Sequence, residues 1–367
     1  MKKMILFLVV FLPIAYCGAQ WQAPSPNARG FVSTGLSFQQ WTFETSDKPI
    51  REVVAPITVF LPLKKGVYLT CSNTPGTASM DSVRLSGISD TWIRGTYIFP
   101  NERFMLTAGI GAPTGKTRLK GDEFVLSQML GENIFRFRLP VYGQGLSLKV
   151  GAGAAFPLQE NAVLGAGIHI ISHGKFKPVD SDSIEYQMGT ETSVFTGVDV
   201  QISPRAKWTL NISYTLYGKD KFNGEEIYAS GKKLLFNTSL SAALGKGMLY
   251  TSLNWRQRGK NEYWIDTGLQ TENKNSNGAQ TEIDAAWQVP WNPQGSFSLL
   301  GTGRFYSKNE YDSGGADVYG GGAGVQYLVS PKTSLQMNLL ILTGNTKASD
   351  KIKISGLDFM AGLTFGL

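Results

Sequence analysis

Two histidines are the side chains best suited to chemistry here, as metal ligands or general bases. They are His169 and His173. Four residues of extended chain separate them by about 13 Å, so they cannot bind one metal ion together. Membrane lipid hydrolases use outward-facing Ser and His, whereas His169 lies on the strand face with the smaller residues, which we expect to point inward. We therefore expect no catalytic residue, metal site, cofactor or enzyme activity.

The first residues and the charge indicate an exported chain. Residues 1–19 have two lysines, an apolar run and small residues, so we predict a signal peptide cleaved after Ala19. Cys17 would allow a lipoprotein signal, but Tyr16 stands where a small residue is expected. Cleavage would leave Cys71 as the one cysteine, so no intramolecular disulfide is expected. The modest, scattered excess of Lys and Arg, 35 against 28 acidic residues, does not favour nucleic acid as a partner.

The segments that would position these residues alternate with a period of two. From Phe104 to Ala112 every second residue is apolar, and the residues between them are mostly small or polar. Lys207–Leu216 and Ser334–Ile341 follow the same pattern. A period of two places the apolar set on one face of a strand and the polar set on the other.

The pattern recurs in sixteen candidate strands, of which Gly30–Thr42, Ala55–Leu61 and Val67–Ser72 are the weakest. Short turns such as Pro100–Arg103 alternate with long connections, as periplasmic turns and extracellular loops do. No apolar run long enough for a membrane helix follows the signal. A soluble β-sandwich also alternates, but no second apolar set would fill its core. We predict an all-β fold, a transmembrane antiparallel β-barrel of about 14 strands, range 12–16, with short periplasmic turns and long extracellular loops.

The last segment supports a bacterial outer-membrane location. From Leu357 to Leu367 every second residue is apolar, up to the end of the sequence. Bacterial outer-membrane barrels usually end in this way, so we expect this strand to be recognised by the barrel-assembly machinery. Membrane lipid would cover the apolar outer faces.

The polar faces carry charges of both signs. In a barrel these side chains point inward, where water or paired side chains satisfy them. The predicted lumen-lining residues include Arg94, Lys149, Asp199, Glu282, Asp284 and Arg304.

The connection Thr114–Gly143 is long and unusually apolar for a loop in water. Asp122–Leu130 could form a short helix with Asp122 as its N-cap. One interpretation is a hydrophobic acceptor site at the extracellular mouth. The other is a loop that folds into the barrel as a constriction. The predicted substrate-binding residues are Phe124, Leu126, Met129, Leu130, Ile134 and Phe135.

Two short motifs carry a resemblance. Gly87-Ile88-Ser89-Asp90 opens one strand, and Pro113-Thr114-Gly115-Lys116 follows the next. In these motifs the sequence resembles outer-membrane transporters related to the long-chain fatty-acid channel FadL, in the branch named for the meta-pathway of phenol degradation. The resemblance implies passive, gated uptake of hydrophobic molecules through a barrel of about 14 strands.

The resemblance does not extend to the N-terminus. FadL has a long N-terminal hatch, whereas only residues 20–29 precede the first strand candidate. We expect one barrel domain over 20–367, with 20–42 serving as a short plug or as the first strand.

The expected function is passive uptake of small hydrophobic compounds of the fatty-acid or aromatic-hydrocarbon type. Two alternatives stay open at this point. One is a general diffusion porin, and the other is a structural or scaffold barrel of a surface machine.

Overall fold

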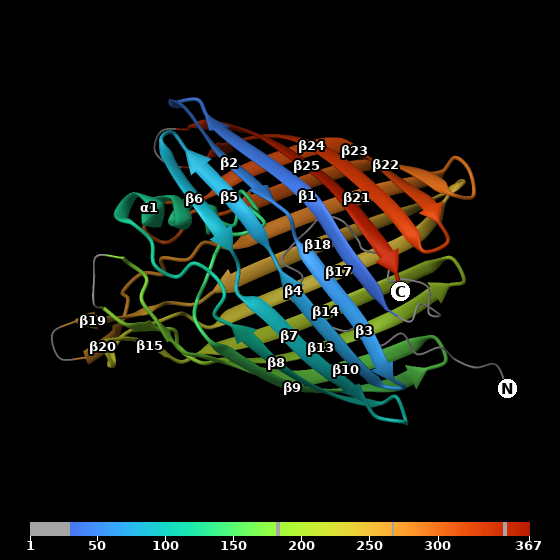
Figure 1. Ribbon diagram of the computed structural model, residues 1–367, viewed down its shortest axis with the longest axis horizontal. Helices are drawn as coiled ribbons and strands as arrows, with labels where there is room; N and C mark the ends of the chain where they lie inside the picture. The colour runs from blue at the N-terminus through green and yellow to red at the C-terminus, as the bar shows by residue number, and fades with distance from the viewer. Residues whose placement is uncertain (1–29, 181–183, 266–267, 348–350) are drawn as a thin grey trace.

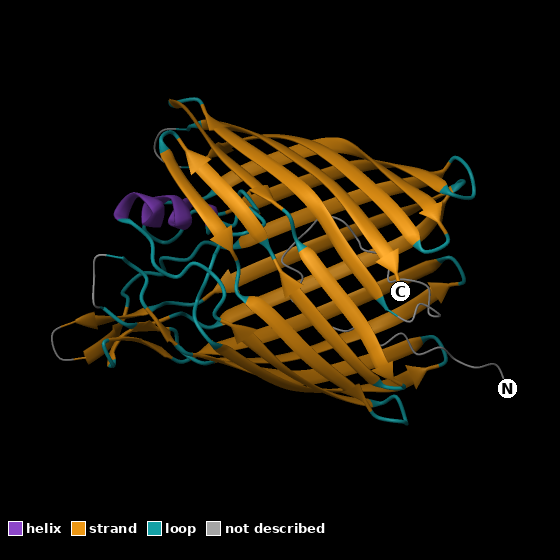
Figure 2. Cartoon of the chain, in the orientation of Figure 1, coloured by secondary structure: helices purple, strands orange, loops and turns teal. Residues whose placement is uncertain are grey.

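The computed structural model describes residues 30–180, 184–265, 268–347 and 351–367. The predicted signal peptide lies outside these residues. The main sheet closes on itself, because β1 (Phe31–Phe43) pairs antiparallel along its whole length with β25 (Lys353–Gly366). The result is an antiparallel barrel (Figures 1 and 2). The predicted fold class is confirmed.

The barrel has sixteen strands in cross-section, the upper end of the predicted range. After β1 the ring continues through β3 (Ile57–Lys64), β4 (Val67–Asn73), β7 (Thr91–Ile98), β8 (Phe104–Ala112), β9 (Ser147–Gln159), β10 (Ala162–His173), β13 (Glu191–Ser203), β14 (Ala206–Tyr217), β17 (Lys233–Leu244), β18 (Gly247–Arg258), β21 (Gln280–Pro290), β22 (Gly295–Tyr306), β23 (Ala316–Ser330) and β24 (Thr333–Thr346) to β25.

Three strands near the N-terminus continue past a break toward the extracellular side. The extensions are β2 (Ser46–Val54), β5 (Pro75–Met80) and β6 (Val83–Ile88). They continue β3, β4 and β7 across Ala55-Pro56, Thr74 and Ser89-Asp90. Pairing persists at the break, where the Ala55 N–H donates to the Pro75 carbonyl and the Ser89 N–H to the Thr74 carbonyl.

The sequence analysis missed these extensions because their faces are inverted. In β2 the residues Ile50 and Val54 are buried inside, while Arg51 on the opposite face is exposed. Outside this part of the wall there is water instead of lipid, so the apolar face turns inward as in a soluble sheet. The barrel pattern of apolar residues facing outward does not apply there.

The barrel wall itself is apolar on the outside. Leu106, Leu148, Val150 and Ile341 are all between 48% and 64% exposed, on the outer faces of β8, β9 and β24. An apolar belt around a closed antiparallel barrel is the surface that a bilayer covers. The protein is an outer-membrane barrel.

The one helix in the described residues is α1 (Gly121–Leu130), in the long connection after β8. It begins one residue before the predicted Asp122, with Lys120 in the N-cap position, because the Glu123 carboxylate accepts the Lys120 N–H. No helix in the described part of the chain is long and apolar enough to cross a membrane.

A second, smaller sheet lies beyond one end of the barrel (Figure 1, lower left). It consists of β11 (Lys175–Phe176), β12 (Tyr186–Gln187), β15 (Lys219–Phe222), β16 (Glu225–Ala229), β19 (Glu262–Ile265) and β20 (Gly268–Thr271). These strands come from the long connections, so this end is the extracellular one.

Candidate functional site

The connection between β8 and β9, residues 114–146 and here named the luminal loop, folds back into the barrel. The Asp90 carboxylate accepts hydrogen bonds from both ends of the loop. One carboxylate oxygen accepts the Gly115 N–H at 2.9 Å, and the other accepts the Gln144 N–H at 2.7 Å. The Thr114 hydroxyl donates to the Ser89 carbonyl at 3.1 Å. The two motifs that carry the family resemblance are therefore in direct contact.

Glycine is required where the loop ends meet. A Cβ on Gly115 would collide with the Tyr142 carbonyl oxygen and lie 2.7 Å from the Gly143 Cα. Any side chain would force the two backbones apart. The neck of the luminal loop thus depends on the Gly of the Pro-Thr-Gly-Lys motif.

The first part of the loop packs α1 on the extensions β5 and β6. Leu126 and Leu130 are buried beneath the helix. The Glu123 carboxylate accepts from the Lys116 ammonium at 2.6 Å and from the Lys120 N–H at 3.0 Å. The helix is therefore fixed to the loop's own first residues as well as to the wall.

The second part of the loop builds an apolar core inside the barrel. The Phe135 ring lies 5.1 Å from the Trp41 ring and 5.7 Å from the Phe43 ring, both on β1. The Phe137 ring packs against the Phe135 ring at a centroid distance of 5.9 Å, with the two ring planes tilted. The cluster also holds buried residues of the wall and of the loop: Ile50, Val54, Ala78, Leu85, Leu126, Leu130, Ile134, Leu139, Tyr142, Val318, Leu342 and Ile354. The extracellular half of the lumen is thus occupied by hydrocarbon.

Arg138 ties this core to one side of the barrel. Its guanidinium donates to Ser37 on β1 at 2.6 Å and to Asp358 on β25 at 3.0 and 3.1 Å. The Glu52 carboxylate on β2 accepts the Arg138 and Leu139 N–H groups at 2.8 and 2.9 Å. Buried charges are thereby compensated by opposite charges and by hydrogen bonds.

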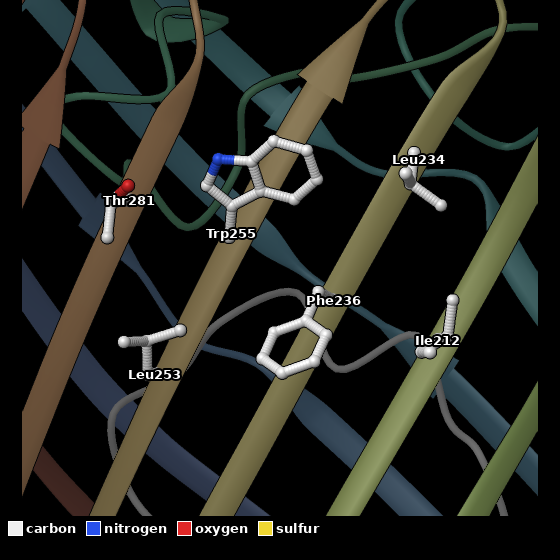
Figure 3. Close-up of a pocket in the computed structure, with 6 residues that line it drawn as sticks. All are labelled: Ile212, Leu234, Phe236, Leu253, Trp255 and Thr281. Carbon is white, nitrogen blue, oxygen red and sulfur yellow. The ribbon is translucent and has the colours of Figure 1, made fainter.

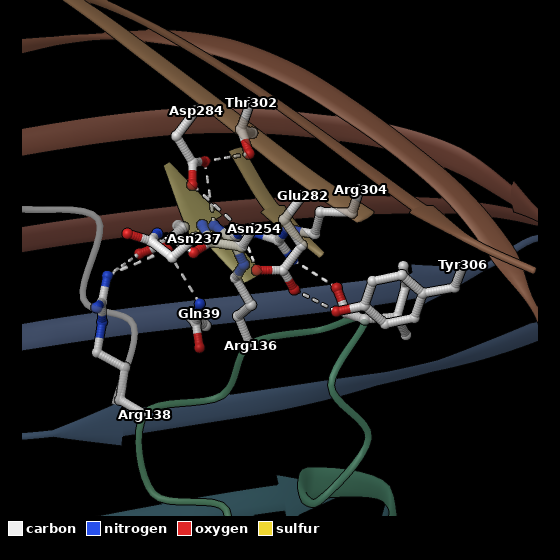
Figure 4. Close-up of polar contacts among 12 residues, drawn as sticks. Gln39, Arg136, Arg138, Asn237, Asn254, Glu282, Asp284, Thr302, Arg304 and Tyr306 are labelled. Carbon is white, nitrogen blue, oxygen red and sulfur yellow. Dashed lines mark hydrogen bonds and ion pairs between the residues drawn. The ribbon is translucent and has the colours of Figure 1, made fainter. Parts of the chain in front are cut away.

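Arg136 ties the core to another part of the wall (Figure 4). Its guanidinium donates to Glu282 at 2.7 Å and to Asp284 at 3.2 Å, both on β21. Burial alone would lower the pKa of Arg136, but the two carboxylates raise it above its ordinary value, so the side chain stays charged. Arg304 on β22 donates to the Ile134 carbonyl at 2.5 Å, and its guanidinium lies over the Trp41 ring.

These contacts hold the luminal loop across the lumen, from β1, β2 and β25 to β21 and β22. A molecule that enters from outside meets side chains where an open pore would hold water. The arrangement can bind apolar groups, and it can act as a constriction whose opening requires the arginine contacts to break.

No protein-family model matches the chain, and no curated protein matches it. Solved structures do resemble it. The "CymD monoaromatic hydrocarbon channel" aligns with 93% of this chain and 89% of its own, at 10% identity and a TM-score of 0.44.

Two further structures align with similar coverage. The "TodX deltaS2S3 mutant monoaromatic hydrocarbon channel" aligns with 94% of this chain and 91% of its own, at 8% identity and a TM-score of 0.47. A "Bacterial polysaccharide outer membrane secretin" aligns with 93% of this chain and 100% of its own, at 10% identity and a TM-score of 0.48. The ligand class must therefore come from this chain's own residues.

The structure divides the six predicted substrate-binding residues by exposure. Phe124 is 37% exposed on α1, and Met129 is partly buried against the core. The other four belong to the buried core itself: Leu126, Leu130, Ile134 and Phe135. A ligand at the mouth would meet Phe124 first and would reach the others only by displacing the loop.

The six predicted lumen-lining residues fall into three groups. Glu282, Asp284 and Arg304 contact the luminal loop. Asp199 accepts from Lys207 at 2.9 Å and from Thr209 at 2.8 Å. Arg94 and Lys149 lie on the inner faces of β7 and β9, away from these contacts.

The two histidines hold no metal ligand set. His173 lies 3.7 Å from the Glu191 carboxylate and makes a hydrogen bond with Ser147, while His169 packs on Phe195. No group of His, Cys, Asp and Glu within the described ranges could hold a metal ion.

An apolar depression lies on the outer wall (Figure 3). Its volume is about 410 Å³. It is lined by Ile212, Leu234, Phe236, Leu253, Trp255 and Thr281. Ile212 and Leu234 are 38% and 36% exposed on outer strand faces, so the depression belongs to the lipid-facing surface.

Sequence reasoning missed the residues that fix the luminal loop. Arg136 and Arg138 alternate with Phe135 and Phe137, and this strand-like period inside a predicted loop was the available signal. This period predicts one apolar face and one cationic face. In the structure the phenylalanines face the apolar core, and the arginines face the carboxylates of the wall. Glu52 gave no signal, since its strand was not predicted.

Proposed function

We propose that this barrel is a passive channel for small hydrophobic compounds, of the fatty-acid or aromatic-hydrocarbon type, and that the luminal loop controls entry. The observation that carries the proposal is the apolar core in the extracellular half of the lumen. General diffusion needs water there, whereas an apolar molecule is stabilised by leaving water for such a core, by roughly 25 cal/mol for each Å² it buries.

The proposed entry site begins at Phe124. This ring is exposed on α1, on the side of the helix away from the buried Leu126 and Leu130. A small apolar molecule would bind beside Phe124 and Met129 and then replace part of the loop's own packing with Ile134 and Phe135. Dispersion and burial would provide the affinity, so neither a nucleotide nor a cofactor takes part, and the compound is not chemically changed.

The arginine contacts would set the resistance to passage. Arg136 and Arg138 are nearly buried and hydrogen-bonded to carboxylates on two parts of the wall. A ligand that wedges into the apolar core would have to displace these contacts or bend the segment between them. We also propose that β25 is the strand by which the barrel-assembly machinery recognises the chain.

Binding of radiolabelled toluene to the purified protein, by equilibrium dialysis against protein-free micelles, tests the entry site. The variant Phe124→Ser removes the exposed ring, and we expect it to weaken binding roughly three- to tenfold. Phe222→Ser is the matched control, because Phe222 on β15 is also 37% exposed but lies on the small sheet. Equal binding by both variants and the wild type would contradict the entry site.

Single-channel conductance in a planar bilayer separates the other functions. The proposal predicts little ionic current through the wild type, because the luminal loop occupies the lumen. A large, steady current would instead indicate a general diffusion porin. Low conductance together with no toluene binding would leave the scaffold barrel, which copurification with partners in fixed proportion would identify.

A further inference from the structure

Two cationic side chains that point into the lumen lie in one row across β7, β8 and β9. They lie away from the contacts that hold the luminal loop. Arg94 on β7 pairs with Gly109 on β8, and Gly109 pairs with Lys149 on β9. The alternate residues Ile93 and Leu148 are 40% and 52% exposed on the outer face, so Arg94 and Lys149 point into the lumen. Gly109 has no side chain, and nothing in the row separates the two cations.

Neither cation has an anionic partner within the described ranges. The Arg94 Nε is shielded from solvent and makes no hydrogen bond. The two positive charges act on each other repulsively. Since a barrel wall ordinarily satisfies such groups with each other or with water, two adjacent uncompensated cations require an explanation.

One acidic side chain attracts Lys149 but does not neutralise the two cations. Glu191 on β13 belongs to the same row as Lys149, beyond Ile171 on β10. It lies 3.7 Å from the His173 Nε2 and is also attracted by Lys233 and Arg258. One carboxylate is thus shared among several cations, and this part of the lumen has an excess of positive charge.

An aromatic surface lies beside the pair. Trp92 is two residues before Arg94 on the same inner face of β7. Its ring covers Gly111 on β8, where an added Cβ would lie 3.0 Å from the ring atoms. An aromatic or aliphatic group could therefore pack on Trp92 while a charged group of the same molecule reaches Arg94 and Lys149.

We propose that Arg94 and Lys149 form a binding site in the lumen for the carboxylate of a small organic acid, whose apolar part packs on Trp92. The planar guanidinium can donate two parallel hydrogen bonds to a carboxylate, and the ammonium adds a third. The proposal rests on the proposed function, because it assigns to the same channel amphipathic acids as a substrate class.

Benzoate and toluene make a suitable pair of probes, since they share the ring and differ in the carboxylate. Equilibrium dialysis of the purified full-length protein should show that the wild type binds benzoate. Arg94→Gln and Lys149→Gln should each weaken benzoate binding about tenfold, and should leave toluene binding unchanged. Lys207→Gln is the control, because the Lys207 ammonium already pairs with Asp199 at 2.9 Å.

Folding is checked separately by heat-dependent gel mobility. Arg94→Glu is the second variant, because its carboxylate would pair with Lys149 and fill the site in a folded barrel. It should abolish benzoate binding and keep toluene binding.

The outcomes separate the two proposals. Toluene binding without benzoate binding overturns the acid site and leaves the hydrophobic channel intact. Benzoate binding that falls in the Gln variants, with no toluene binding, supports the acid site and contradicts the hydrophobic entry site. Equal benzoate binding by wild type, both Gln variants and Arg94→Glu overturns the acid site.

Discussion

The side of the lumen that holds the loop and the side formed by β7, β8 and β9 compensate their charges differently. On the first side, Arg136 and Arg138 each bind carboxylates from the wall. On the second, Arg94 and Lys149 face each other across a glycine, without an acidic partner in the described residues. Fixed pairs position a segment of the chain, whereas unpaired cations are available to a mobile ligand. The difference separates the luminal loop from the proposed acid site.

Removal of Glu282 should give the largest effect. This buried carboxylate accepts from Arg136 and from the Tyr306 hydroxyl. In Glu282→Ala the Arg136 charge keeps only Asp284 as its acidic partner on β21, and the almost fully buried Arg304 loses a neighbouring anion. We expect the free energy of unfolding to fall by about 3–5 kcal/mol. Denaturant unfolding in detergent, followed by tryptophan fluorescence, measures it.

An exposed ion pair supplies the control. Glu226 pairs with Lys219 on the small sheet, and both side chains are more than 40% exposed. Glu226→Ala should change the free energy of unfolding by less than about 1 kcal/mol. If both variants lose the same stability, the contacts of Arg136 do not hold the loop.

Most of the barrel could be predicted from the sequence, because lipid outside and polar groups inside impose a period of two on every strand. The ranges 104–112 and 207–216 show this pattern, and β8 and β14 confirm it. The strand number was less certain, since the family resemblance implies about 14 and the ring has sixteen. The extensions β2, β5 and β6 were not predicted, because water surrounds them and their apolar residues face inward instead of outward.

The luminal loop could be found from its composition, but its course could not be predicted. Phe135 meets Trp41 and Arg136 meets Glu282 across long stretches of sequence, and no periodicity specifies such pairs. The sequence predicts inward-facing charges at Glu282, Asp284 and Arg304, and in the structure these side chains contact the luminal loop. Which of them would be neutralised depends on the loop, so the contrast with Arg94 emerges only in three dimensions.

Loss of the Asp90 contacts should free the ends of the luminal loop without unfolding the barrel. In Asp90→Ala the N–H groups of Gly115 and Gln144 lose their charged acceptor. Hydrogen bonds to a charged group contribute about 1.5–3 kcal/mol, and this loss falls on the ends of the loop alone. We expect higher single-channel conductance and faster tryptic cleavage within residues 114–146.

Asp81→Ala is the matched control for this variant. Asp81 pairs with Lys48 on the exposed side of the extensions, away from the ends of the loop. Its conductance should equal that of the wild type. An Asp90→Ala channel that stays closed and resists trypsin would show that the core packing alone keeps the loop in place.

Replacement of Arg94 should have a smaller effect of opposite sign. Because Arg94 is uncompensated and repels Lys149, Arg94→Leu should raise the free energy of unfolding by about 1 kcal/mol. Arg304→Leu is the comparison. Because Arg304 donates a hydrogen bond to the Ile134 carbonyl, this variant should lower the free energy of unfolding. Destabilisation by Arg94→Leu would mean that the cation is compensated in the free protein, and the contrast between the two walls would be lost.

The smallest expected effect is a pH dependence of the loop. Burial raises the pKa of Glu123, but the Lys116 ammonium and the Lys120 N–H outweigh it, so the pKa lies below its ordinary value of 4.5. A carboxyl with a lowered pKa stabilises the folded loop fully above that ordinary value. The contribution is lost as the pH falls from 4.5 through the lower, folded pKa.

Hydrogen exchange of residues 114–146, corrected for intrinsic rates, would measure this dependence between pH 6 and pH 3. The loss should be below about 1 kcal/mol, because Lys116 is partly exposed. Glu123→Gln should remove the pH dependence and leave the exchange of β17 and β18 unchanged. A loop that loosens equally in Glu123→Gln and wild type would show that Glu123 is not the group whose protonation loosens it.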